Sequence, residues 1–235
     1  MITGDNIDSK NANWSFSGEV PKNFDNHVGK SVPMYSEGHE LVSRLSDFFL
    51  ADGSKCYEIG SSTGELTEKL AKHNILKKVT FVGIDPIIEM VEVANEKCKD
   101  ISNISFICDD ILNIELEKSD LIVSYYTIQF IKPRVRQLVF NKIYDSLNWG
   151  GAFILFEKVR ACDARFQDMM TALYTDYKLE QGYTEEEIVS KTRSLKGVLE
   201  PFSTQGNIDL LKRSGFVDIT TVLKYVSFEG FLAIK

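Results

Sequence analysis

Short apolar runs alternate with segments of helical periodicity from about residue 55 onward. The apolar runs lie at 55–59, 79–85, 104–108, 120–124 and 152–156. They are separated by segments whose apolar positions recur at helical spacing. Runs that are apolar throughout are typical of strands buried on both faces, and their alternation with helices is typical of a parallel sheet. The pattern therefore predicts an α/β fold with a mostly parallel sheet.

The alternation ends after the fifth strand. Residues 163–182 and 184–195 predict two successive helices with no strand between them, which makes a helical insertion at about 162–206. A helix at 208–214 follows it, and two strands at 216–226 and 230–235, joined by a turn at Phe228-Glu229, complete the chain. We expect a seven-stranded sheet with one antiparallel strand.

The first 20 residues are polar and rich in Asn, Asp and Ser, without the basic start and apolar segment of a secretory signal. We expect a flexible tail at 1–20 and a single domain at 21–235. Residues 24–35 have too little helical periodicity for a long helix, whereas 37–50 predict a helix. Further along, a helix from Pro133 should stop at the glycines of 148–151.

Composition narrows the class of protein. The 235 residues are 43% hydrophobic and 26% charged, and no apolar run is long enough to cross a bilayer, so we expect a cytoplasmic protein and no membrane partner. A net charge of −7 argues against direct nucleic-acid binding and favours a small-molecule substrate. The histidines and cysteines lack metal-ligand spacing, so we expect no metal and buried free thiols at Cys56, Cys98, Cys108 and Cys162.

Candidate chemistry begins in the turn after the first strand, where Gly60 and Gly64 bracket Ser61, Ser62 and Thr63. Glycine allows a tight turn and close approach of the backbone to a ligand. The following helix places free N–H groups beside the turn. On these residues alone, a plain strand-to-helix turn remains an alternative.

Three carboxylates accompany this turn. Asp85 and Asp110 close the second and third strands, where open α/β sheets bind ligands. Asp85 lies about twenty residues beyond the glycine turn, at the distance where nucleotide-binding units place a ribose-binding carboxylate. Each could instead be a solvated loop residue or a helix cap. Glu58 could hold the N–H groups of the turn and not touch the ligand.

Taken together, these features resemble the class I S-adenosylmethionine-dependent methyltransferases, with Glu58-x-Gly60-x-x-x-Gly64, Asp85, Asp110 and the C-terminal hairpin. The fold expected is therefore the Rossmann-like class I methyltransferase fold. Ser62 stands where a dinucleotide motif would have a third glycine, which weakens that alternative. From about Phe24 onward, the chain also resembles the carboxy-S-adenosylmethionine synthases, through Ser31-Val32-Pro33-x-Tyr35, Thr127-x-Gln129-Phe130, Lys142-Ile143-Tyr144, Gly150-Gly151-Ala152, Glu157-Lys158, Gly182-Tyr183, Glu187-Ile188 and Arg193-Ser194.

This resemblance implies that S-adenosylmethionine is deprotonated at its methyl group and takes up carbon dioxide released from prephenate. The products would be carboxy-S-adenosylmethionine and phenylpyruvate. It also implies a homodimer, and a downstream carboxymethyltransferase that modifies a tRNA wobble uridine or a related nucleoside. The binding site implied for S-adenosylmethionine or carboxy-S-adenosylmethionine consists of Tyr35, Glu58, Gly60, Ser61, Ser62, Gly64, Asp85, Pro86, Asp110, Ile111, Tyr125 and Arg193.

Arg193 and Tyr35 are the residues to which the resemblance assigns the distinctive chemistry, since the family uses the matching pair to bind the carboxyl end of the product. A guanidinium can hold a carboxylate by two parallel hydrogen bonds. Alternatively, Arg193 is one more charge on a solvated helix. No residue stands out as the base that deprotonates the methyl group.

Two positions depart from the family pattern: Tyr125 replaces a usual asparagine, and Tyr174-Thr175 replace a usual histidine pair. A small-molecule methyltransferase and a non-catalytic S-adenosylmethionine-binding module remain the alternatives.

Overall fold

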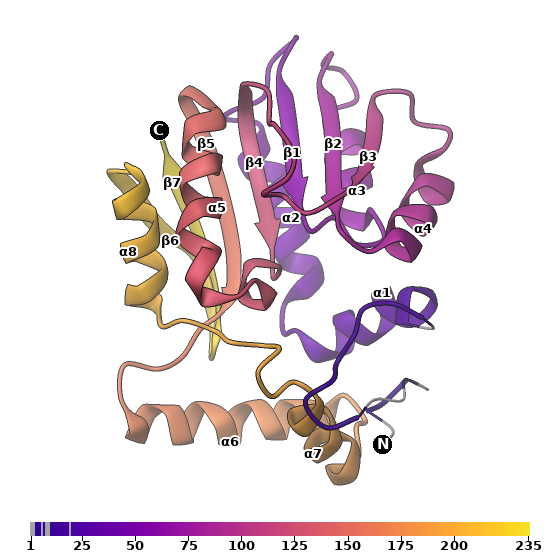
Figure 1. The fold of residues 1–235 in the computed structure, drawn as a ribbon, viewed down its shortest axis with the longest axis vertical. Helices are drawn as coiled ribbons and strands as arrows, with labels where there is room; N and C mark the ends of the chain where they lie inside the picture. The colour runs from indigo at the N-terminus through magenta and orange to yellow at the C-terminus, as the bar shows by residue number, and fades with distance from the viewer. Residues whose placement is uncertain (1–2, 6, 8–9, 19) are drawn as a thin grey trace.

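The computed structural model describes residues 3–5, 7, 10–18 and 20–235, and these contain a sheet with the strand order β3-β2-β1-β4-β5-β7-β6 (Figure 1). β1 to β5 are parallel, and β7 runs antiparallel to both β5 and β6. The predicted α/β fold, with seven strands of which one is antiparallel, is confirmed. The strands are β1 (Lys55–Ile59), β2 (Thr80–Asp85), β3 (Ile104–Cys108), β4 (Ser119–Tyr125), β5 (Leu147–Lys158), β6 (Asp218–Tyr225) and β7 (Phe228–Ile234).

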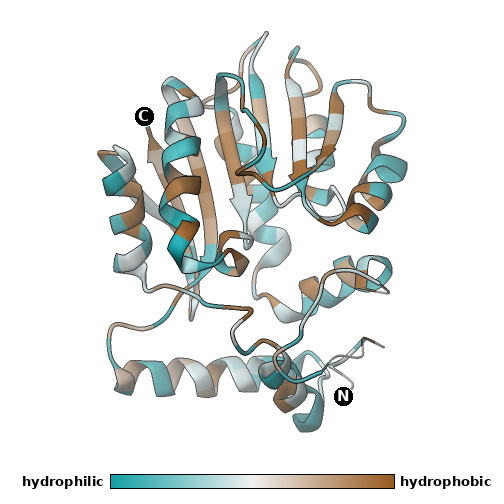
Figure 2. Cartoon of the chain, in the orientation of Figure 1, coloured by the Kyte–Doolittle hydropathy of each residue, from teal (hydrophilic) through white to brown (hydrophobic). Residues whose placement is uncertain are grey.

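Helices cover both faces of the sheet. Successive residues of a strand point to opposite sides, so each central strand packs against helices on both faces. Tyr57 and Ile59 of β1 pack in an apolar cluster with side chains of α5 (Pro133–Ser146) and α8 (Thr204–Ser214). Cys56 packs in a second cluster with α2 (Tyr35–Ser46) and α3 (Glu65–His73). In Figure 2 the hydrophobic colour accordingly concentrates in the strands. Burial on both faces explains why the strands read as near-continuous apolar runs.

The expected insertion forms α6 (Ala164–Glu180) and α7 (Glu185–Ser194). Both helices begin at side-chain caps: Asp163 accepts from the Phe166 N–H, and Thr184 and Glu187 form a capping box. The two helices lie beyond the carboxyl ends of the parallel strands, together with α1 (Val20–Ser31), as Figure 1 shows. The insertion and α1 therefore face the edge of the sheet at which the parallel strands end.

Helix α1 was not predicted, and the expectation of too little periodicity for a long helix over 24–35 is wrong. Its buried residues include the polar His27 and Ser31, which form hydrogen bonds with Tyr183 far along the chain. Val20, Phe24 and Val28 recur at helical spacing, but the buried face of α1 also includes His27 and Ser31, so the apolar stripe is sparse over the window that begins at Phe24. α2 begins at Tyr35, two residues earlier than expected.

The N-terminal arm, by which we mean residues 3–5, 7 and 10–18, differs from the loose tail that we expected. Ala12 N–H donates to the Arg193 carbonyl at 2.9 Å, and Trp14 N–H donates to the Ser194 carbonyl at 3.1 Å. Ile7 and Trp14 are buried in a cluster with Met90 of α4 (Ile88–Cys98). The arm therefore packs on α7 and α4; residues 1–2, 6, 8–9 and 19 of the expected tail lie outside the described part.

Some local boundaries also differ from prediction. The glycine stop at 148–151 is absent, because β5 begins at Leu147 immediately after α5, and Gly150 lies within it with φ +81°. The final turn occupies residues 226–227, between β6 and β7, and not Phe228-Glu229. All four cysteines are free, but Cys108 on the edge strand β3 and Cys162 are exposed.

Candidate functional site

The loop after β1 turns through backbone conformations that side chains disfavour. Gly60 and Gly64 have φ of +75° and +76°, and Ser62 between them has +49°. A Cβ on Gly60 would overlap Thr127, and one on Gly64 would lie 2.8 Å from the Phe106 ring. Glycine is required at both positions by backbone conformation and by neighbouring side chains.

Asp85, at the end of β2, holds this loop from the neighbouring strand. Its Oδ2 accepts from the Ser62 N–H and its Oδ1 accepts from the Ile87 N–H, both at 2.9 Å. Burial raises the pKa of Asp85, while the two N–H bonds act in the opposite direction. Each carboxylate oxygen has a second lone pair, so Asp85 can also accept a hydrogen bond from a ligand hydroxyl.

Glu58 does not hold the N–H groups of the loop, an alternative that the sequence left open. Its Oε2 accepts from the Thr67 hydroxyl of α3, and the Thr67 backbone N–H also bonds to the carboxyl. Burial raises the pKa of Glu58 to about 8, with Asp85 and Glu65 adding repulsion. Asp85, and not Glu58, is the carboxylate that fixes the glycine loop.

The end of β3 contributes Asp110 and Ile111 in different environments. Asp110 is exposed, and its Oδ1 accepts from the Leu112 N–H at 2.9 Å. Ile111 is buried in the apolar cluster beneath α5. Both residues line the same cavity as Asp85 and Pro86.

Tyr125 closes β4 and contacts the first turn of α2. Its ring lies 5.2 Å from the Tyr35 ring and 4.6 Å from that of His39. Burial raises the pKa of both tyrosines. The next residue, Tyr126, has φ +58°, an uncommon conformation for an aromatic residue. This strained backbone lies where β4 opens into the cavity.

Three buried or half-buried lysines line the opposite part of the site: Lys158 at the end of β5, Lys178 on α6 and Lys191 on α7. Burial lowers the pKa of all three side chains, to about 7 for Lys158 and about 8 for Lys178. Lys191 Nζ lies 3.1 Å from Nε2 of His27. This end of the site is therefore basic, whereas the glycine-loop end is acidic.

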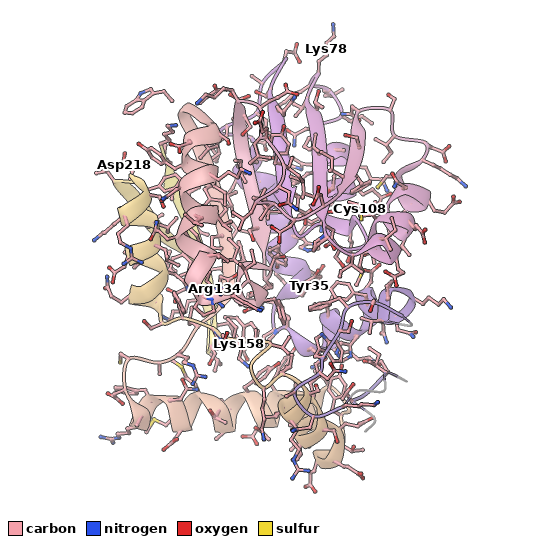
Figure 3. All side chains as sticks on the ribbon, viewed as in Figure 1. Tyr35, Lys78, Cys108, Arg134, Lys158 and Asp218 are labelled. Atoms are coloured by element: carbon pink, nitrogen blue, oxygen red, sulfur yellow. The ribbon has the colours of Figure 1, made fainter. Side chains whose placement is uncertain are left out.

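Most of these residues surround one cavity of about 990 Å³, which is in the range of small-molecule sites. It lies between the carboxyl ends of the parallel strands and a cover made of the N-terminal arm, α1, α6 and α7. Figure 3 shows Tyr35, Arg134 and Lys158 in this region. The predicted residues that line it are Tyr35, Glu58, Gly60, Ser61, Ser62, Asp85, Pro86, Asp110, Ile111 and Tyr125.

Two predicted site residues are not among those that line the cavity. Gly64 packs against Phe106 and Ala94, on the side of α4 and β3. Arg193 is exposed on α7, although its neighbours Lys191 and Thr192 line the cavity. The backbone carbonyl of Arg193 binds the N-terminal arm through Ala12.

Sequence reasoning missed the lysines and the aromatic residues of the arm. Trp14 and Phe16 both line the cavity. The sequence indicated these residues only by the presence of two aromatic side chains in an otherwise polar segment. Lys178 follows Tyr174 by one helical turn, so the two share a face of α6, but spacing alone did not say which face is buried.

Within the described residues, no group of His, Cys, Asp and Glu could hold a metal ion. No helix there has the length and apolar character to span a membrane.

Comparison with known proteins gives one family and one fold. A family model described as "Methyltransferase domain" matches residues 57–151. Two curated proteins named carboxy-S-adenosyl-L-methionine synthase are similar to this chain. The one from Staphylococcus epidermidis is 39% identical, and the match covers 94% of this chain and 97% of that protein. The one from Nautilia profundicola is 37% identical, and the match covers 94% of each chain.

Among solved structures, human N-acetylserotonin methyltransferase in complex with SAM superposes with a TM-score of 0.64 and 17% identity, covering 94% of this chain and 57% of that one. An O-methyltransferase family protein from Burkholderia thailandensis has a TM-score of 0.65 and 13% identity, covering 92% and 59%. These structures share the fold.

Proposed function

The chain belongs to the carboxy-S-adenosyl-L-methionine synthases, and we propose that it converts S-adenosylmethionine and prephenate to carboxy-S-adenosylmethionine and phenylpyruvate. It is thus an S-adenosylmethionine-dependent transferase. The choice of prephenate is supported by the distribution of charge in the cavity. Acidic residues line its glycine-loop end, and basic and aromatic residues line the other end of the same cavity. Such a cavity suits a cationic nucleoside beside a small organic dianion.

The residues at the glycine-loop end fit the nucleoside. Asp85 has free lone pairs for the ribose hydroxyls, and Asp110 with Ile111 would hold the adenine side. The Ser61 hydroxyl is buried and lines the cavity, yet it has no hydrogen-bond partner among the described residues. A buried hydroxyl of this kind is completed by a ligand or by water.

When bound, S-adenosylmethionine supplies a sulfonium methyl group that exchanges a proton for carbon dioxide by forming a carbon–carbon bond. Prephenate loses its ring carboxylate as carbon dioxide and its hydroxyl as hydroxide, so its ring becomes aromatic. Hydroxide and the methyl proton together make water, which balances the reaction. In this scheme Tyr35, Tyr125 and Tyr126 line the cavity as aromatic walls, which attract a sulfonium cation and exclude water.

The test is to incubate the pure protein with S-adenosylmethionine and prephenate and to weigh the nucleoside product. A mass gain equal to carbon dioxide, together with phenylpyruvate, supports the proposal. S-adenosylhomocysteine formed only with an added acceptor supports a small-molecule methyltransferase instead. Binding of S-adenosylmethionine without turnover supports a non-catalytic module.

The role expected for Arg193 is a further part of this proposal. Because Arg193 is exposed and does not line the cavity of its own chain, it could bind the product's carboxylate only after α7 moves or from a second copy of the chain. Arg193→Ala should then weaken binding of carboxy-S-adenosylmethionine while leaving the fold intact, as measured by calorimetry and circular dichroism. Unchanged affinity would remove this role.

A homodimer is supported by an exposed apolar face on α6. Phe166, Met169 and Leu173 are 48%, 48% and 55% exposed, and their spacing places them on one side of the helix. Light scattering of the pure chain should give twice the monomer mass. Leu173→Lys should shift it toward the monomer, whereas a monomeric wild-type chain would contradict the proposal.

The product would serve a separate cytoplasmic carboxymethyltransferase that modifies a tRNA wobble uridine or a related nucleoside. The net charge of −7 supports a synthase that does not itself bind nucleic acid. We expect no tRNA shift in a gel-mobility assay at physiological salt, and a salt-sensitive shift would contradict this.

A further inference from the structure

We propose that Lys158 and Lys178, whose ammonium groups both lie against the Tyr174 ring, form a subsite for a carboxylate of the second substrate. The assignment rests on the proposed function, because that reaction brings a small organic dianion into the cavity beside the nucleoside.

The ring of Tyr174 brings the two lysines together. Lys158 Nζ lies 3.9 Å from the centroid of Tyr174 and 5.5 Å from that of Phe228. Lys178 Nζ lies 5.4 Å from the centroid of Tyr174 and 5.3 Å from that of Tyr183. The Tyr174 hydroxyl donates to the Ser31 carbonyl at 2.8 Å, which fixes the ring. Lys158 lies between the sheet and α6 (Figure 3).

Among the described residues, neither ammonium group has an anionic partner. In the part of the chain that the structure describes, the side-chain contacts of Lys158 and Lys178 are with aromatic rings, and no hydrogen bond or ion pair reaches them. Lys178 is only 6% exposed. Burial lowers the pKa of both amines, and Lys178 and Arg160 further lower that of Lys158 by repulsion. Burying a cation without an anion is unfavourable, so a carboxylate ligand would supply the missing charge and hydrogen bonds.

The surroundings favour an organic acid over inorganic phosphate. Tyr174 and Phe228 give the subsite an apolar wall, against which the carbon skeleton of an acid can pack. Phosphate would gain nothing from this wall.

The sheet topology separates this subsite from the acidic residues. Asp85 ends β2 and Asp110 lies just beyond β3, whereas Lys158 ends β5, on the far side of β4. The charge of the cavity therefore changes sign along the edge of the sheet. This orients the two substrates, with the anion beneath α6 and the nucleoside over the glycine loop.

The test compares Lys158→Met and Lys178→Met with Lys72→Met, a control at an exposed lysine on α3 that is paired with Glu68. For each variant, the KM for prephenate and the Kd for S-adenosylmethionine are measured, with thermal unfolding as a check on folding. We expect the KM for prephenate to rise on the order of ten- to a hundredfold in both cavity variants, as for a lost charged hydrogen bond. The Kd for S-adenosylmethionine should change by less than about threefold, and the control should match wild type.

An unchanged KM for prephenate, or an equal loss of S-adenosylmethionine affinity, would overturn the subsite while leaving the proposed function intact. So would stronger competition by inorganic phosphate than by phenylpyruvate. If the wild-type chain makes no carboxylated nucleoside, the proposed function fails, and phenylpyruvate becomes the binding probe. Phenylpyruvate binding that needs Lys158 would still support the subsite, and binding that ignores Lys158, or no binding, would refute it.

Discussion

The phenolic hydroxyl of Tyr125 donates a hydrogen bond of 2.7 Å to the backbone carbonyl of Tyr35. It thereby ties the end of β4 to the first residue of α2. Gly38, about one turn into α2, leaves space for this hydroxyl, because a Cβ there would overlap it. The departure from the family's usual asparagine therefore has a structural use: Tyr125 holds the helix that presents Tyr35 to the cavity.

Tyr125 and Gly38 should be energetically coupled. Tyr125→Phe should cost about 1 kcal/mol through the lost hydrogen bond. Gly38→Ala should cost more in the wild-type chain than in the Tyr125→Phe background, where the nearest atom to the new Cβ is the ring Cζ at 3.1 Å. Urea unfolding of the four proteins gives the coupling. Gly29→Ala in α1 is the control, since nothing lies within 4 Å of its Cβ position; strictly additive effects of the first pair would contradict the coupling.

Ser62 should tolerate glycine better than any branched residue. With φ +49°, Ser62→Gly relieves backbone strain and keeps the N–H that Asp85 accepts, so stability should be unchanged or higher by up to about 1 kcal/mol. Ser62→Val should cost roughly 1–2 kcal/mol. Thermal unfolding with and without S-adenosylmethionine measures both, and a more stable valine variant would refute the strain.

Asp85 and Asp110 should separate into two roles. Asp85→Asn places an amide group against backbone N–H donors, so it should lower stability by roughly 1–3 kcal/mol and weaken binding of the nucleoside. Asp110→Asn is the matched control, because Asp110 does not hold the glycine loop. It should weaken binding while stability changes by less than about 0.5 kcal/mol. Equal stability losses would contradict the assignment.

Glu58 should make folding stability depend on pH. The unfolded carboxyl releases its proton near pH 4.5 and the folded one near pH 8, so the folded state binds more protons in that window. Stability contributed by Glu58 should therefore fall as pH rises from 4.5 to 8, by a few kcal/mol at most. Glu58→Gln should flatten the profile measured by urea unfolding. Glu117→Gln, at a site 76% exposed, should follow wild type, and a Glu58→Gln profile as steep as wild type would exclude the effect.

Much of the fold could be predicted, because short stretches of apolar and polar positions determine most of the strands and helices. β1 and β3 have the predicted limits, since each is a short apolar run with a clear stop. The loop residues and Asp85 were placed at the cavity because the carboxyl ends of parallel strands share one edge. Where a helix buries polar groups beside few apolar ones, as α1 does with His27, the apolar stripe was too sparse for the helix to be predicted.

The sequence by itself determined the α/β fold, the positions of the carboxylates at the strand ends and the resemblance that identifies the family. Only the tertiary structure decided that Asp85 and not Glu58 holds the glycine loop, that Lys158 and Lys178 enter the cavity, and that Arg193 does not line it. The physical reason is the distance along the chain over which each feature is decided. A strand's periodicity fixes the direction of its side chains, whereas the buried face of an inserted helix depends on how it packs over a sheet edge built from distant residues.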